Sequence, residues 1–180
     1  MLCYNKKSCA FQKGTLMLAL EITSIKQFMN HLLAADSFDI FLLEEAVIGT
    51  ANTFTIDGHI NKEFFSGEDA PELSCEFRPW KDIRSLCFDL IKGKRTPVFF
   101  RFVLHLMPEK AAALLESRGC DTDASQIRAL VLNIRYDGAK AVLTTATAFH
   151  TFVPSKEPDA IWDKALLQYL EQKGIGYELL

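Results

Sequence analysis

The stretch AVIGTANTFTIDGHINKEFF, residues 46–65, decides the fold. Its dipeptide Asp57-Gly58 separates two runs that are rich in β-branched and aromatic residues. Asp-Gly is among the strongest short-range signals for a two-residue hairpin turn, because both central residues of that turn need a positive φ. The stretch therefore predicts a long antiparallel hairpin that turns at Asp57-Gly58 and gives the helical segments a sheet to cover.

The remaining patterned segments supply a second hairpin, a single strand and the helices. Asp137-Gly138 predicts a hairpin over residues 126–152, and segment 97–107 (PVFFRFVLHLM) has two apolar faces, as a central strand covered at least partly on both sides does. Helical spacing of apolar residues, with proline and glycine at the boundaries, predicts helices over residues 24–35, 79–92, 108–118 and 158–173. We expect an α+β fold: an antiparallel or mixed sheet built from two Asp-Gly hairpins plus a central strand, covered by about four helices.

Length and composition fit one globular domain. The chain has 180 residues, of which 49% are apolar and 24% are charged, the ordinary proportions of a globular protein. Residues 1–16 lack periodicity and precede Met17, where the patterned sequence begins. We interpret residues 1–16 as a disordered or extraneous tail and residues 17–180 as a single α+β domain.

Charge and cysteine usage argue against several classes of partner. The formal net charge of −3 gives no general reason to expect nucleic acid or an anionic membrane as a partner. No apolar run approaches the roughly 18 residues that a membrane-spanning helix requires. The five cysteines are odd in number and include no Cys-x-x-Cys pair, so neither a disulfide framework nor a zinc site is expected. These features predict a cytoplasmic protein.

The densest group of cations is a candidate ligand-binding site. Lys92, Lys94 and Arg95 surround a glycine at the end of a predicted helix, and Arg101 follows on the predicted central strand. Such a group can bind a phosphate or a nucleic-acid backbone. The competing interpretation is that these lysines cap the helix and complement its dipole, whose C-terminal end is negative.

Two further residues are weaker candidates for ligand or partner binding. Asn52 belongs to a polar strip in the first hairpin that can line a small-molecule pocket, although turn chemistry explains the same residues. Trp80 stands beside charged residues at the start of a predicted helix, where it is either an exposed interaction anchor or part of the core.

Three histidines, His59, His105 and His150, fall on predicted strands that a sheet can bring together. A metal site or an acid–base pair would follow only if carboxylates such as Glu44, Glu45 or Asp57 approached them. No H-E-x-x-H or comparable spacing is present. We therefore assign no catalytic residue, no metal ligand and no cofactor.

The segments FDIFLLEEAVIGTANTFTIDGHINKEFF, LIKGKRTPVFFRFVL and LNIRYDG, with the helix around Trp162, resemble an uncharacterised bacterial family of unknown function found mainly in anaerobic Gram-positive species. The resemblance covers residues 18–175 and implies a bacterial, cytosolic protein that starts at Met17. It brings no known substrate, cofactor or catalytic residue.

The expected function is non-catalytic binding. The protein would contact a protein partner or a second copy of itself through an exposed sheet edge or the Trp80 region. One alternative is weak binding of nucleic acid or a phosphate ligand by the loop from Lys92 to Arg95, with nucleic acid the less expected partner. The other is a small hydrolase or metal enzyme that uses the strand histidines, and an enzyme is the less expected class.

Overall fold

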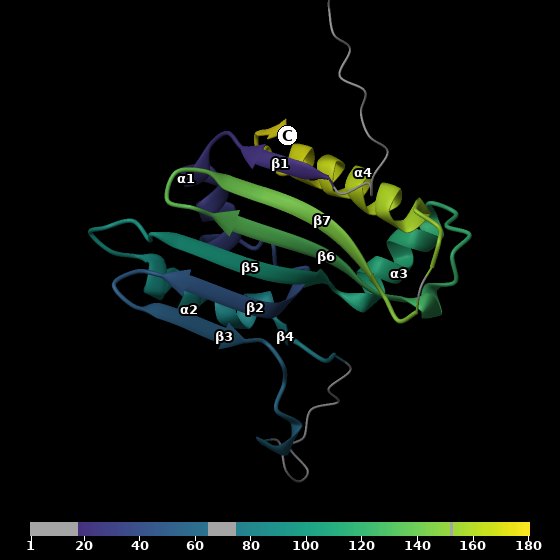
Figure 1. Cartoon of the computed structure of the whole chain (residues 1–180), viewed down its shortest axis with the longest axis horizontal. Helices are drawn as coiled ribbons and strands as arrows, with labels where there is room; N and C mark the ends of the chain where they lie inside the picture. Colours follow the sequence, from purple (N-terminus) through teal and green to yellow (C-terminus); the bar gives the residue numbers. More distant parts are fainter. Residues whose placement is uncertain (1–17, 65–74, 152) are drawn as a thin grey trace, which may run out of the picture.

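The computed structural model describes residues 18–64, 75–151 and 153–180, and its frame is an antiparallel sheet with helices on one face (Figure 1). The strands are β1 (Ala19–Ile22), β2 (Phe41–Gly49), β3 (Thr53–Asp57), β4 (Arg78–Pro79), β5 (Phe99–Leu106), β6 (Ile127–Tyr136), β7 (Ala141–Phe149) and β8 (Tyr177–Leu179). The helices are α1 (Ile25–Met29), continued by the π-helical turn η1 (Asn30–Ala34), α2 (Trp80–Ile91), α3 (Pro108–Ser117) and α4 (Glu157–Gln172). Short 3-10 turns are η2 (Lys62–Phe64) and η3 (Ala124–Gln126).

The predicted α+β class and the four helices are confirmed. The predicted tail, residues 1–16, and most of the loop before α2 lie outside the described residues.

The strand order is β3-β2-β5-β6-β7-β1-β8, with the short β4 paired to β2. Every pairing is antiparallel, which resolves the choice between an antiparallel and a mixed sheet. No strand was predicted at residues 19–22 or 177–179. These two segments pair with each other and extend the sheet beyond β7.

The hairpin predicted around Asp57-Gly58 is wrong: the observed hairpin, β2–β3, precedes this dipeptide, and residues 59–64 after it form no strand. β2 and β3 are joined at residues 50–52, where the Thr50 N–H donates to the Asn52 carbonyl over 2.9 Å. Asp57 ends β3, and Gly58 is not among the glycines with a positive φ. A Cβ on Gly58 would lie 1.7 Å from the Leu43 carbonyl oxygen. This glycine is needed because another strand passes close to it, and sequence alone does not distinguish that need from a tight turn.

The second hairpin turns where it was predicted. β6 and β7 pair up to Tyr136 and Ala141, and Gly138 has a φ of +94°. The Asp137 carboxylate accepts hydrogen bonds from the N–H groups of Ala139 and Lys140 over 2.9 and 2.8 Å. These hydrogen bonds lower the pKa of the Asp137 carboxyl below its ordinary value.

The core lies between the helices and one face of the sheet. Alternate residues of β5, from Phe100 to Leu106, are buried there, and Phe100 stacks between Phe102 and Tyr136 with ring centroids 5.0 and 4.9 Å apart. On the other face, Phe99 and Arg101 are exposed. On that same face Val103 is half-buried and His105 is buried, so β5 is partly covered on both faces, as predicted. No helix among the described residues is long and apolar enough to cross a membrane.

Candidate functional site

The predicted basic loop connects α2 to β5. Helix α2 ends at Ile91, and Lys92 leaves it with φ −64° and ψ 120° while its N–H donates to the Phe88 carbonyl over 2.7 Å. Lys92, Lys94 and Arg95 are all exposed. The chain rejoins the sheet where the Val98 N–H donates to the Gly49 carbonyl over 2.8 Å. The structure thus brings these three predicted cations together on one short connection.

The loop borders a hollow of about 490 Å³ that opens between α1 and the end of α2. We call it the basic hollow. Its base is formed by sheet residues Phe100 and Tyr136, both buried, and its sides by residues of the two helices. The apolar side chains that line it include Ile25, Met29, Leu33, Ile91, Phe100 and Tyr136. A volume of this order is typical of sites that enclose small molecules.

The rim of the basic hollow is positively charged. Lys26 of α1 joins the three cations of the loop, and no Asp or Glu is among the described residues that line the hollow. Of these four side chains, none forms an ion pair with the part of the chain that the structure describes. The helix dipole does not account for the whole group, because its field falls off within the last turn and Lys94 and Arg95 lie beyond it. The hollow therefore combines an apolar interior with uncompensated positive charge.

The other predicted binding residues do not line the basic hollow. Arg101 follows Phe100 on β5, so it faces the opposite side of the sheet, where it forms an ion pair with Glu45. Asn52 is an exposed residue of the β2–β3 turn. Thr50 and Ala51 of the same turn line a second hollow with the basic loop, so Asn52 belongs to a turn beside that loop.

Trp80 belongs to the core, and its interpretation as an exposed anchor is wrong. Its side chain is fully buried, and its indole Nε1–H donates to the Leu32 carbonyl over 2.9 Å. The ring lies 5.3 Å from that of Phe102, between centroids. Burial of the first apolar position of an amphipathic helix is the common outcome.

Of the three histidines predicted on strands, only His105 lies on one, whereas His59 follows β3 and His150 follows β7. His105 and His59 have carboxylate partners. His105 Nε2 lies 2.5 Å from Glu44 Oε2, and His59 Nδ1 lies 2.7 Å from Asp57 Oδ1. Hydrogen bonds from His59, first from its backbone N–H and then from its ring, lower the pKa of the Asp57 carboxyl. The rings of His59 and His105 contact Phe77, at 4.5 and 4.8 Å between centroids. The two histidines are thus separated by one aromatic ring.

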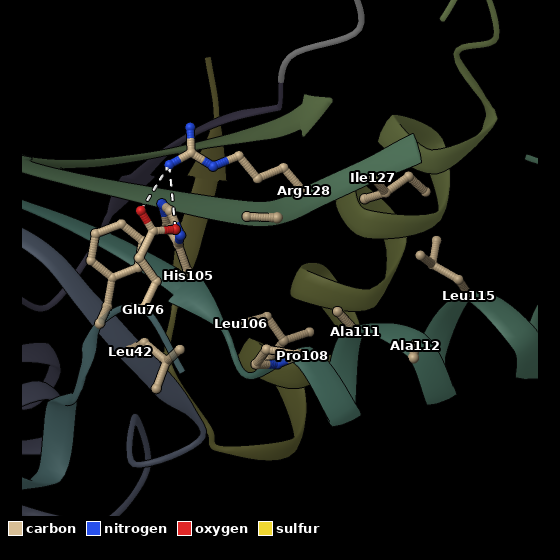
Figure 2. A pocket seen from close by; sticks show the side chains of 12 residues that line it. Leu42, Glu76, His105, Leu106, Pro108, Ala111, Ala112, Leu115, Ile127 and Arg128 are labelled. Carbon is tan, nitrogen blue, oxygen red and sulfur yellow. Dashed lines mark hydrogen bonds and ion pairs between the residues drawn. The ribbon is translucent and has the colours of Figure 1, made fainter. Parts of the chain in front are cut away.

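A pocket of about 300 Å³ lies beside His105 (Figure 2). One side is apolar and includes Ala111 and Leu115 of α3. Glu76 and Arg128 lie together on the other side of the pocket, where Arg128 Nη2 is 3.4 Å from Glu76 Oε1 (Figure 2). The pocket therefore joins an apolar wall to a buried histidine and a charged pair.

The His105–Glu44 pair can hold and transfer a proton. Glu44 is the extra residue of a bulge in β2, because the register with β5 shifts between Leu43 and Glu45. His105 is 6% exposed, so its ring lies almost out of solvent. The described residues that line the pocket include no hydroxyl, thiol or amine that can act as a nucleophile. Among the described residues there is also no group of three His, Cys, Asp or Glu side chains arranged for a metal ion.

Three of the four cations of the basic hollow, Lys92, Lys94 and Arg95, were predicted from the sequence, but neither Lys26 nor the apolar half was. Met29 and Ile91 were assigned to helix faces that pack on the core, which is how helical spacing is ordinarily explained. In the structure both side chains line the basic hollow, together with Phe100 and Tyr136 of the sheet. The sequence pattern that could have indicated this hollow is a cluster of cations directly after a helix that has an apolar face.

The comparisons with known proteins give a family without an assigned function. The sequence model of a family described as "Family of unknown function (DUF5721)" matches residues 31–178. No curated protein and no solved structure matches this chain.

Proposed function

We propose that this chain, which belongs to the family of unknown function DUF5721, is a binding protein for a small lipophilic anion, held in the basic hollow. The ligand class is an alkyl or aryl molecule with one carboxylate or phosphate group. The observation that carries the proposal is an apolar hollow of about 490 Å³ with four cations and no carboxylate among the described residues of its lining.

The two halves of the hollow account for the two halves of the ligand. An apolar tail that enters between α1 and α2 leaves water, at a gain of about 25 cal/mol per Å² of apolar surface buried. The anionic group stays at the rim, where Lys94 and Arg95 keep it solvated and paired. This arrangement avoids the cost of burying a charge inside the core.

The proposal is tested by isothermal titration calorimetry with decanoate, decyl phosphate, decylamine and inorganic phosphate. We expect the two lipophilic anions to bind, with an affinity that falls as salt is raised, and decylamine not to bind. Equal affinity for inorganic phosphate and decyl phosphate would contradict the role of the apolar interior. Equal affinity for decylamine and decanoate would contradict the role of the rim.

Two variants and a matched control separate the contributions. Lys94→Glu with Arg95→Glu should weaken decyl phosphate binding at least tenfold, because each of the two contacts loses roughly 0.5–1 kcal/mol of attraction and gains a similar repulsion. Lys81→Glu with Lys164→Glu changes the net charge equally at exposed positions outside the lining and should leave the affinity unchanged. Met29→Gln should weaken decanoate binding by placing an amide in the apolar wall.

The double variant Lys94→Glu with Arg95→Glu also tests the alternative that the basic loop binds nucleic acid. If single-stranded oligonucleotides bind and the lipophilic anions do not, and if Lys94→Glu with Arg95→Glu abolishes that binding, the rim serves a nucleic-acid backbone instead. The apolar interior favours the small ligand.

A second candidate function, acid–base chemistry at His105, is favoured by the His105–Glu44 pair beside the 300 Å³ pocket. The generic probe is 5-nitrobenzisoxazole, whose ring opens when a base removes one carbon-bound proton. We expect ring opening above the solvent rate, lost in His105→Gln and reduced in Glu44→Gln. A rate that is the same in His105→Gln as in the unaltered protein would refute this candidate.

A cytoplasmic location is part of the proposal and rests on the cysteines. Cys87 and Cys120 form no disulfide with another described residue, as expected of a reducing compartment. Fractionation of cells that produce the full chain tests it, and recovery outside the cytoplasmic fraction would contradict it.

A further inference from the structure

The face of the sheet opposite the helices carries two pairs of like charges in one row. The β5–β6 register places Arg101 directly opposite Arg135, and the β1–β8 register places Glu21 directly opposite Glu178. Between the two pairs stands Val142 of β7, which is opposite Arg135 on one side and Glu21 on the other. We call these five residues the charged row.

Each pair opposes the folding of the sheet. Like charges directly across an antiparallel ladder are destabilising, because their side chains lie about 5 Å apart at Cβ. Within the chain, Arg101 is paired with Glu45 and Glu21 with Lys140, whereas Arg135 forms no ion pair with the residues that the structure describes. Arg135 and Glu178 are both exposed. The row therefore places two clusters of opposite sign, each only partly compensated, on one open surface.

From this order we infer that the open face of the sheet binds a second copy of the chain, related by a two-fold axis parallel to β7 at Val142. Rotation by 180° about this axis places the partner's charged row in the reverse order against the charged row of the first copy. Arg135 then faces the partner's Glu21, and Arg101 faces the partner's Glu178. The positions match because the strands of both sheets have the same spacing of about 4.8 Å, with the facing sheets about 10 Å apart.

The other residues of the open face are also compatible with a second copy of the chain as the partner. No helix lies in front of it in Figure 1. Beside the charged row, the register places Val103, Asn133 and Thr144 across three neighbouring strands, then Val131 opposite Ala146. Asn133 and Thr144 line, with Val142, a hollow of about 910 Å³ on this face, so the charges beside it, and not close packing there, set the alignment of the two sheets. A self-complementary patch of this kind is what a two-fold interface requires.

The test exchanges the charges of one facing pair. In Arg135→Glu, a two-fold pairing sets two carboxylates against each other at two symmetric places, and in Glu21→Arg it does the same with two cations. An equimolar mixture of the two variants restores opposite charges at both places. We expect the unaltered full chain to be a dimer in sedimentation equilibrium, each variant alone to dissociate with at least a tenfold larger dissociation constant, and the mixture to form a one-to-one dimer.

Controls separate an effect on folding from an effect on association. Circular dichroism and the melting temperature establish that each variant is folded, and Lys164→Glu changes the charge at an exposed position of α4 outside the open face. The inference is overturned if the unaltered protein is monomeric throughout the range measured. It is overturned equally if both variants dimerise as tightly as the unaltered protein, or if the mixture of folded variants stays monomeric.

Discussion

Replacement of Gly58 by alanine tests why the first Asp-Gly dipeptide contains a glycine. A Cβ at this position would lie 1.7 Å from the Leu43 carbonyl oxygen and 2.6 Å from its carbonyl carbon, well inside van der Waals contact. Both obstructing atoms are backbone, so no side-chain rotation relieves the overlap. Either β2 or the segment after β3 has to move by more than an ångström.

The cost follows from the hydrogen bonds that hold those segments together. The Gly58 N–H donates to the Glu44 carbonyl, and the Arg78 N–H donates to the Gly58 carbonyl, each over 2.9 Å. Gly58 is buried, so groups separated by the movement lose their partners without gaining full hydration. With about 1–3 kcal/mol for each partner left unsatisfied, Gly58→Ala should lower the free energy of unfolding by about 3 kcal/mol.

Urea denaturation measures this change, and Gly119 supplies the control. Gly119 has a φ of +65° and nothing within 4 Å of an added Cβ, so its replacement by alanine meets only the backbone penalty of about 1 kcal/mol. Asparagine tolerates a positive φ but has a Cβ, and it should therefore be accepted at Gly119 and rejected at Gly58. A loss below 1 kcal/mol for Gly58→Ala, or tolerance of Gly58→Asn, would refute the reasoning.

Three further predictions concern buried polar and ionisable groups. Trp80→Phe removes the indole donor to the Leu32 carbonyl and should cost about 1–3 kcal/mol in urea denaturation. Thr147→Val should stabilise the protein by about 1 kcal/mol in the same assay, because the Thr147 Oγ1 atom is buried without a hydrogen-bond partner among the described residues. Burial raises the pKa of the Cys87 thiol from 9.0 to about 12, so its contribution to stability is intact below pH 9 and is lost as the pH rises toward 12. Melting temperatures between these pH values should fall less steeply in Cys87→Ala, and an unchanged slope would count against burial of the thiol.

The elements that sequence analysis predicted well are those with a local cause. The helices follow from apolar spacing, and the Asp137-Gly138 turn follows from a glycine whose φ is +94° and an aspartate that caps its own loop. β1 and β8 have no comparable signal, because both are short, β1 is held by β7 and β8 from much later in the chain, and β8 is held by β1. Strands defined by such distant pairing are not specified by local pattern.

Less of the candidate sites than of the fold could be predicted from the sequence, because each site combines residues that come together only in the folded structure. Lys94 and Arg95 were found from composition, but their significance depends on α1, which the chain reaches more than sixty residues earlier. The side chains of His105 and Glu44 are in contact because a bulge in β2 inserts Glu44 as an extra residue opposite β5. A sequence contains the residue types for such a pair, whereas the bulge that aligns them arises from the fit between two strands.

The two proposed surfaces use alternate residues of the same two strands. Phe100 and Tyr136 form the base of the basic hollow, while their neighbours Arg101 and Arg135 face the opposite side in the charged row. β5 is paired on both sides, with β2 and β6, so these positions lie in the middle of a continuous ladder. Coupling between two sites requires an element with two alternative arrangements that both sites bias, and a fully paired central strand offers none. Arg135→Glu should therefore change the dimer dissociation constant and leave decyl phosphate affinity unaltered. A ligand-dependent dissociation constant would instead mean that Tyr136 and Arg135 move together when the hollow is filled.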